Sequence, residues 1–259
     1  METSITGAET AISLVLVGVA IALSLWRGLG VERQLLVAST RAAAQLLAVG
    51  YLFVAILEHR NAIWFGWAWV IAMTIITALV AHRRAPGLPG GAVLAFLTVA
   101  ASTAVCLAVV FGLGVLPYNA TALVVMAGIT IGNTLPSIVL AAKQLLRQVD
   151  EQRIQIEGLL ALGFDGNGVV RFAGRDLART ALIPQIERTN VVGLIALPGA
   201  MTGLLLAGVD PIDAVLIQLV VMYLILGAVA TSVNIIVSVG LRRCLTPDLR
   251  LRPGLEQHR

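Results

Sequence analysis

The sequence predicts an all-α, polytopic membrane protein with about seven transmembrane helices. Of its 259 residues, 58% are hydrophobic and only 12% are charged, and the mean hydropathy is +0.93. A water-soluble globule of this size cannot bury so many apolar side chains. The charges also gather in short islands, which are separated by apolar runs of roughly 17–25 residues, the length that a helix needs to cross a bilayer.

Seven apolar segments fit the length of a membrane span. They are expected, to within several residues, at about 10–26, 35–57, 63–81, 92–113, 120–141, 190–208 and 212–240. We expect these spans to form one transmembrane domain over residues 1–259, with a cytoplasmic segment at about 142–189.

The basic residues predict that the N-terminus lies outside and the C-terminus in the cytoplasm. In that orientation, the cytoplasmic islands and Arg41 hold seventeen of the eighteen Lys and Arg residues, and only Arg60 lies outside. The positive-inside rule favours this arrangement. The isoelectric point near 9.7 then reflects topology and contact with anionic lipid, and the basic residues lack the interleaved aromatic residues typical of a nucleic-acid surface. The cytoplasmic islands are 27–34, 82–90, 142–189 and 241–259.

The second expected span carries two polar residues on one helix face, Arg41 and Gln45, which are four residues apart. A charge at the bilayer centre costs about 2.5–3.5 kcal/mol on insertion scales. Arg41 lies close to the cytoplasmic end of the span, so its side chain can reach the inner interface. A place in a polar pathway or a helix contact is the alternative.

The fifth expected span contains a proline break. Pro136 has no N–H, so the carbonyl of Gly132 loses its helical partner, and Asn133 lies at the break. The freed carbonyl needs a side chain, a water or a cation instead. Gly128 and Gly132 form a small-xxx-small pair that allows close helix packing. A kink that serves packing alone is the alternative.

The sixth expected span also contains a proline. Pro198 is expected to free the carbonyl of Leu194, and Gly199, Met201 and Thr202 follow it. Discontinuous helices of this kind form binding sites in many transporters, and a plain kink explains the pattern equally well.

Polar or helix-breaking residues of three segments are expected at the same depth in the membrane. At 1.5 Å per residue, Arg41 with Gln45, Asn133 with Pro136, and Pro198 each fall roughly 10–15 Å from the inner face. This coincidence predicts a gate or a substrate-loading region in the cytoplasmic half of the membrane. Which side chains would bind a metal ion is left open.

The cytoplasmic segment is predicted to form two helices joined by a turn at Phe164-Asp165-Gly166-Asn167. The first helix would continue the fifth span beyond the membrane, and the second would be amphipathic. The charge pattern fits two interpretations equally well. The two helices lie in water or on the lipid surface, or one of them binds in a cleft of an ATPase.

The chain is predicted to be a transport subunit without an ATP site of its own. Lys143 is its single lysine and is followed by Gln144, whereas a Walker A loop needs Gly-Lys-Ser/Thr. The expected spans also lack a Ser/His, paired-Asp or His-Glu-x-x-His arrangement, which disfavours an intramembrane enzyme.

From about residue 35 to 240, the chain resembles the FetB-type (YbbM-like) ABC permeases, bacterial proteins assigned to iron export and related to plant aluminium-tolerance permeases. Two positions depart from the family pattern, because a methionine is expected at Ala200 and a glutamine at Leu204. The matching runs are Arg41-Ala-Ala-Ala-Gln45, Gly128-Ile-Thr-Ile-Gly132-Asn133, Glu157…Ala161-Leu-Gly163, Leu197-Pro198-Gly199…Met201-Thr202-Gly203 and Pro211…Ala214…Gln218.

The resemblance implies a homodimeric permease subunit of the bacterial plasma (inner) membrane that exports iron or another metal ion. A separate ABC ATPase would bind ATP and Mg, so no cofactor is expected on this chain. The loop by which such permeases contact their ATPase is matched by Glu157, Ala161, Gly163 and Phe164. The alternative function is a transporter or channel that works without an ATPase.

The predicted topology can be tested by cysteine labelling in a cysteine-free background. Asp165→Cys should react only with reagents that reach the cytoplasm, because the basic islands place this residue inside. Ile212→Cys should react with a membrane-impermeant maleimide added outside the cell. The reverse pattern would contradict both the orientation and the assignment of residues 142–189 to the cytoplasm.

Overall fold

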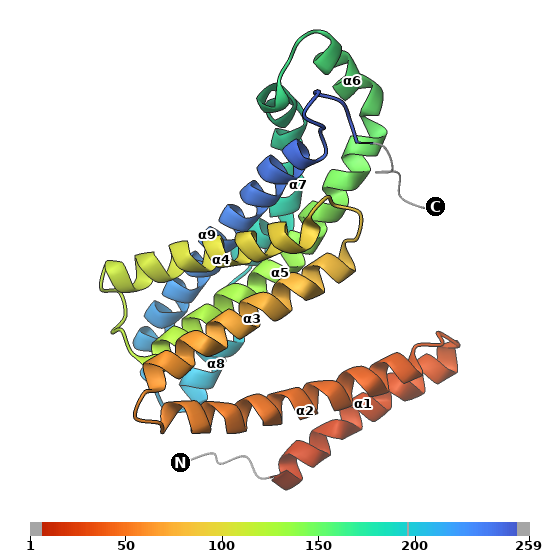
Figure 1. Ribbon diagram of the computed structural model, residues 1–259. Coiled ribbons are helices and arrows are strands. Elements are labelled where there is room, and N and C mark those ends of the chain that lie inside the picture. Colours follow the sequence, from red (N-terminus) through yellow and green to blue (C-terminus); the bar gives the residue numbers. More distant parts are fainter. Residues whose placement is uncertain (1–6, 196, 253–259) are drawn as a thin grey trace. The chain divides into compact units, whose positions relative to one another are not determined.

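The computed structural model describes residues 7–195 and 197–252. In this part of the chain, every secondary-structure element is an α-helix, which confirms the predicted all-α class (Figure 1). In chain order they are α1 (Gly7–Arg27), α2 (Glu32–Leu57), α3 (Ala62–Arg84), α4 (Gly91–Gly112), α5 (Ala120–Glu151), α6 (Arg153–Ala161), α7 (Gly166–Asn190), α8 (Gly199–Leu206) and α9 (Pro211–Arg243).

Five helices are long and apolar enough to cross a membrane, namely α2, α3, α4, α5 and α9. They coincide with five of the expected spans to within a few residues at most ends, except that α5 runs ten residues further, from the predicted end at 141 to Glu151. The first expected span is also a helix, α1, whose apolar part, Leu14–Arg27, is shorter.

The expectation of one continuous sixth span over 190–208 is wrong. α7 ends at Asn190, the described backbone between 191 and 198 is not helical, and α8 contains only 8 residues. Eight helical residues extend about 12 Å, far less than the roughly 30 Å of hydrocarbon.

The chain leaves the helix before it reaches Pro198. Gly193 has a φ of +85°, a left-handed conformation that glycine adopts without steric strain. Pro198 therefore does not kink a helix. It directly precedes α8, where its carbonyl accepts hydrogen bonds from both the backbone N–H (3.0 Å) and the hydroxyl (3.1 Å) of Thr202.

The helices form two compact units. In the first unit, α1 and α2 pack as a hairpin whose turn contains Gly28 and Gly30, with φ of +61° and +67°. The buried Ser24 hydroxyl donates a hydrogen bond of 2.6 Å to the carboxylate of Glu32 across this turn. Most other described side chains of the unit are exposed, so lipid or a partner must cover its apolar faces.

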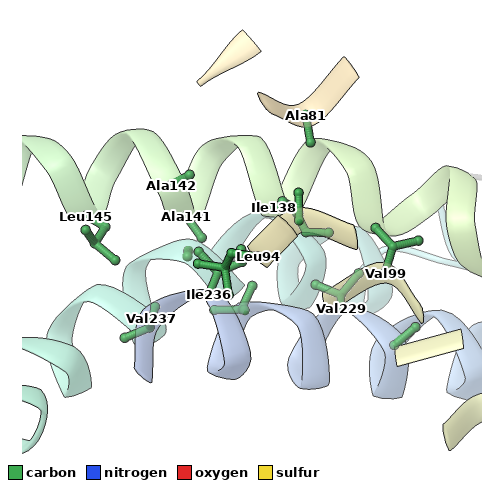
Figure 2. Close-up of a cluster of buried hydrophobic side chains, with 14 of the residues drawn as sticks. Ala81, Leu94, Val99, Ile138, Ala141, Ala142, Leu145, Val229, Ile236 and Val237 are labelled. Atoms are coloured by element: carbon green, nitrogen blue, oxygen red, sulfur yellow. The ribbon is translucent and has the colours of Figure 1, made fainter. Parts of the chain in front are cut away.

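The second unit is built around α5 and α9, against which α4 and α7 also pack. Its core contains Leu94 and Val99 of α4, Ile138 of α5, and Val229 and Ile236 of α9, all at most 2% exposed (Figure 2). α3 joins the same core through buried residues such as Ala81.

Glycine allows the helices of the second unit to approach closely. A Cβ atom at Gly240 of α9 would lie 2.7 Å from Cδ1 of Leu145, and one at Gly174 of α7 would lie 3.2 Å from Cγ1 of Val237. A larger residue at either position would require the facing side chain to shift, and small residues are what allow helices to approach this closely. The close contacts hold α7 and α5 firmly on α9, and the candidate site is built on these three helices.

Candidate functional site

We call residues Ala161–Asn167, which join α6 to α7, the docking turn. Gly163 has a φ of +88°, and the Asp165 carboxylate accepts a hydrogen bond of 2.9 Å from the N–H of Gly168, which caps α7. The Phe164 ring lies against Gly168, where a Cβ atom would be only 2.8 Å from Phe164 Cδ1. The non-helical residues of the turn are 162–165, so the turn begins two residues earlier than the predicted 164–167.

The helix before the docking turn differs in one detail from the expectation. α5 ends at Glu151, and α6 is a separate short helix that begins after Gln152, whose φ of −103° and ψ of 19° lie outside the helical range. The first predicted helix is thus divided in two. The second is one helix, α7, with one buried stripe and one exposed face, as an amphipathic helix requires.

The four residues predicted to contact an ATPase, Glu157, Ala161, Gly163 and Phe164, are all exposed on α6 and the docking turn. Large apolar side chains are exposed beside them: Ile154 is 87% and Leu162 is 79% exposed. A set of apolar side chains this open, on a short helix flanked by charged residues, is typical of a protein-binding surface. Contact with an ATPase itself stays a prediction.

The docking turn is fastened to the end of α9. Arg242 donates a hydrogen bond of 2.6 Å from Nη2 to Oδ1 of Asn167, and the Asn167 amide donates one of 3.0 Å to the second carboxylate oxygen of Asp165. The N–H of Gly168 lowers the pKa of Asp165 below its usual value, with a smaller contribution from Asn167. A short charged network therefore connects the turn with a transmembrane helix.

The chain beyond α9 supports the same turn. Leu245 packs near Gly166, where a Cβ atom would lie 3.5 Å from Leu245 Cδ1, and Leu245 pairs with Leu251 in a single β-bridge. Cys244 next to it is fully buried, and burial raises the pKa of its thiol to about 11. The segment after α9 is thus folded and packs against the docking turn.

The second candidate region is the proline break in α5. The helix continues through Pro136. The Asn133 side chain donates a hydrogen bond of 2.8 Å from Nδ2 to the carbonyl of Ile129, and its Oδ1 accepts one of 3.2 Å from Nη1 of Arg188. Gly132 is exposed, and nothing in the described chain lies within 4 Å of the position of its Cβ.

Arg188 is the residue that sequence reasoning missed, because it was assigned to the cytoplasmic segment. Its position follows from the antiparallel course of α5 and α7. The Gln148 amide donates a hydrogen bond of 3.1 Å to the carbonyl of Ala173. This contact and the one between Arg188 and Asn133 are 15 residues apart on each helix (148 − 133 = 15 and 188 − 173 = 15). The residue numbers rise along α7 as they fall along α5, as in an antiparallel pair.

One signal in the sequence pointed to this end of α7. Pro184 lies inside the helix, and the polar residue Gln185 directly follows it. Gln185 is 7% exposed, and its amide lies 3.4 Å from the hydroxyl of Thr189. A second proline-containing segment thus lies beside the break in α5.

The other predicted pathway residues are not brought to Asn133 by any described contact. Arg41 and Gln45 are exposed on α2 in the first unit. Pro198, Gly199, Met201 and Thr202 form the start of α8, which has no buried residue among those described. Their common depth with Asn133 stays a prediction. Within the described ranges, no group of three or more His, Cys, Asp or Glu residues could hold a metal ion.

The apolar helices of both units define a helical membrane protein. Residues 8–245 match the model of the uncharacterised protein family UPF0014, and the chain belongs to that family. The resemblance to FetB-type proteins is therefore confirmed. No solved structure matches the chain.

Three relatives illustrate the range of the family. The chain is similar to the UPF0014 membrane protein STAR2 of Oryza sativa, with 35% identity over 83% of this chain and 75% of the relative. It is 30% identical to ALUMINUM SENSITIVE 3 of Arabidopsis thaliana, over 86% of this chain and 82% of the relative. It is also 30% identical to the Escherichia coli protein named "Probable iron export permease protein FetB", over 88% of each chain.

The cap of α7 should make the protein sensitive to acid. Since the folded pKa of Asp165 is depressed, its carboxylate stabilises the fold above the unfolded pKa of about 3.9, and this stabilisation is lost as the pH falls through the lower folded pKa. Asp165→Ala should therefore lower the Tm of the detergent-solubilised protein at pH 7, by a margin that disappears in strong acid. Asp165→Asn, which retains a capping side chain, is the control. An equal loss for both variants at pH 7 would show that capping is not the cause.

Proposed function

We propose that this chain is the permease subunit of an ABC transporter that exports iron or another metal ion. A separate ATPase subunit would bind ATP and Mg and supply the energy, and this chain would catalyse no reaction. The observation that carries the proposal is the exposed docking turn, with its apolar side chains, fastened through Asn167 and Arg242 to α9. The name of the Escherichia coli relative supports the choice of cargo.

The transporter would lie in the bacterial inner membrane with seven crossings, the N-terminus outside and the C-terminus in the cytoplasm. Aromatic residues at one end of α3 and α5 support this placement: the Trp67 indole donates a hydrogen bond of 2.8 Å to the hydroxyl of Tyr118, and such residues favour the membrane interface. At the opposite end, Arg243 of α9 donates one of 3.0 Å to the carbonyl of Gly90, just before α4.

The sixth crossing would be composite. α5 and α9 both run from outside to the cytoplasm in this orientation, and α7 runs antiparallel to both. The chain would therefore start to return along the second half of α7 and complete the crossing through the non-helical residues before α8. Non-helical backbone at membrane depth is tolerated where it faces protein or a water-filled cavity, so this crossing would line the pathway.

A second copy of the chain would complete the transporter. Gly128 and Gly132 lie on a face of α5 where nothing in the described chain is within 4 Å of either Cβ position. Small residues with this spacing allow two helices to pack closely. The cargo would pass near this interface, where the break at Pro136 and the side chains of Asn133, Arg41, Gln45 and the α8 start supply polar atoms.

The docking turn gives a direct test of ATPase binding. Gly163→Trp should abolish co-purification of the ATPase while the permease stays inserted, because a Cβ atom at this position meets nothing within 4 Å and the added bulk would lie on the surface proposed to contact the ATPase. Recovery of the ATPase would be measured by affinity purification of the tagged permease. Normal recovery would refute the placement and favour a transporter that works without an ATPase.

Backbone strain needs its own control in this experiment. Any side chain at Gly163 must adopt a φ of +88°, which disfavours all residues except glycine. Gly163→Ala introduces the strain without the bulk and should retain the ATPase. Ala161→Trp introduces bulk without this strain and should lose it.

The proline break gives a test of the pathway. A metal cation that leaves water must find replacement oxygen atoms, and Asn133 is an amide at the break. Asn133→Leu should reduce metal export, measured as iron retention in cells under metal stress, without lowering the amount of permease in the membrane. Normal export by this variant would show that Asn133 serves packing alone.

A further inference from the structure

α7 is held by an arginine contact at each end. At its first turn, Asn167 accepts a hydrogen bond of 2.6 Å from Arg242 of α9. Near its last turn, Arg188 donates one of 3.2 Å to Asn133 of α5. The helix has 25 residues and so extends about 37 Å. It therefore joins the docking turn to the proline break in α5.

Between these ends, α7 is one helix that packs closely along one face. One stripe of the helix is buried along its whole length, and Gly174 fits against Val237 of α9. The Gln148 side chain also fixes the carbonyl of Ala173. Packed helices shift as units between discrete arrangements, and a shift of α7 along α5 would break this hydrogen bond. A displacement of the docking turn would therefore move Arg188.

The proposed topology places the Arg188 contact within the thickness of the membrane. Asn133 follows the first residue of α5 by thirteen positions, or about 20 Å. If the hydrocarbon begins near the start of α5 and is about 30 Å thick, Asn133 lies about 10 Å inside its cytoplasmic boundary. A guanidinium remains charged at this depth and requires polar partners.

The Asn133 side chain binds Arg188 through its carbonyl oxygen, Oδ1. Its amide nitrogen already donates to the carbonyl of Ile129, which leaves Oδ1 as the acceptor. The same oxygen is what a dehydrated metal cation would need at the break. A guanidinium on Oδ1 occupies that oxygen and repels a second positive charge nearby.

We propose that Arg188 is a latch on the metal pathway and that α7 operates it. In the conformation described, the guanidinium blocks Oδ1 of Asn133 against a divalent cation. When the docking turn moves, α7 withdraws Arg188 and the oxygen becomes available to the cargo. This inference rests on the proposed function and adds a gating residue to it. Arg188 acts by position and charge, through Asn133.

The transport test uses the permease with its ATPase in inverted membrane vesicles, with Fe²⁺ as the probe and a reductant present. Arg188→Gln should retain the bound ATPase and its ATP hydrolysis. Because a latch that cannot close lets Fe²⁺ flow back, the net Fe²⁺ moved per ATP should fall about tenfold, within the range of coupling between sites. Arg188→Lys, which retains the charge, should recover part of the loss. Arg175→Gln removes the same charge from an exposed position of α7 and should behave as wild type.

A second measurement does not depend on transport. The Tm of the purified permease in detergent is compared for Asn133→Leu, Arg188→Gln and the double variant. If the two side chains act as one contact, the double variant should be little less stable than the worse single variant. The same non-additivity is expected for Fe²⁺ movement.

Two results would overturn the inference. Additive effects on Tm would show that Arg188 and Asn133 do not interact, and a normal Fe²⁺-to-ATP ratio in Arg188→Gln would show that the contact does not gate transport. If the wild-type vesicles moved no Fe²⁺ while the Tm effects were non-additive, the proposed function would be rejected together with the gating role, and the contact alone would stand.

Discussion

The close packing of α9 against α5 and α7 is the constraint on which the second unit depends. Lipid chains are as apolar as leucine, so in hydrocarbon the hydrophobic effect does not drive helices together, and van der Waals contact must do so. Gly240 and Gly174 provide it by letting neighbouring helices approach. At its C-terminal end, α9 also holds the docking turn through Arg242 and the turn before α4 through Arg243.

Sequence reasoning located those parts of the fold that depend on local composition. An uninterrupted apolar run, as in α4 or α9, specifies both a helix and its length, because every backbone polar group must be satisfied within the segment. The docking turn was also predictable, since Gly163 and Asp165 carry local signals for a left-handed residue and a helix cap. Each of these features is decided by residues within one or two turns of one another.

The remaining features depend on contacts between distant parts of the chain. Glu187 and Arg188 are charged, so hydropathy placed them outside the membrane and moved the sixth span to begin after them. The structure instead satisfies Arg188 with an acceptor 55 residues away, on α5, and Arg242 with an acceptor 75 residues away, on the docking turn. A polar residue near a proline inside a helix, as at Gln185, was the available sign that a charged segment could lie beside a membrane helix.

The two arginine contacts of α7 also restrict how this protein can change in evolution. Asn167 and Arg188 are 21 residues apart on one helix (188 − 167 = 21), and both must face their partners. One inserted or deleted residue would rotate one end relative to the other by about 100°, so that only one contact could form. Substitutions can accumulate on the exposed face, but insertions and deletions should be confined to α6, the docking turn and the non-helical residues before α8.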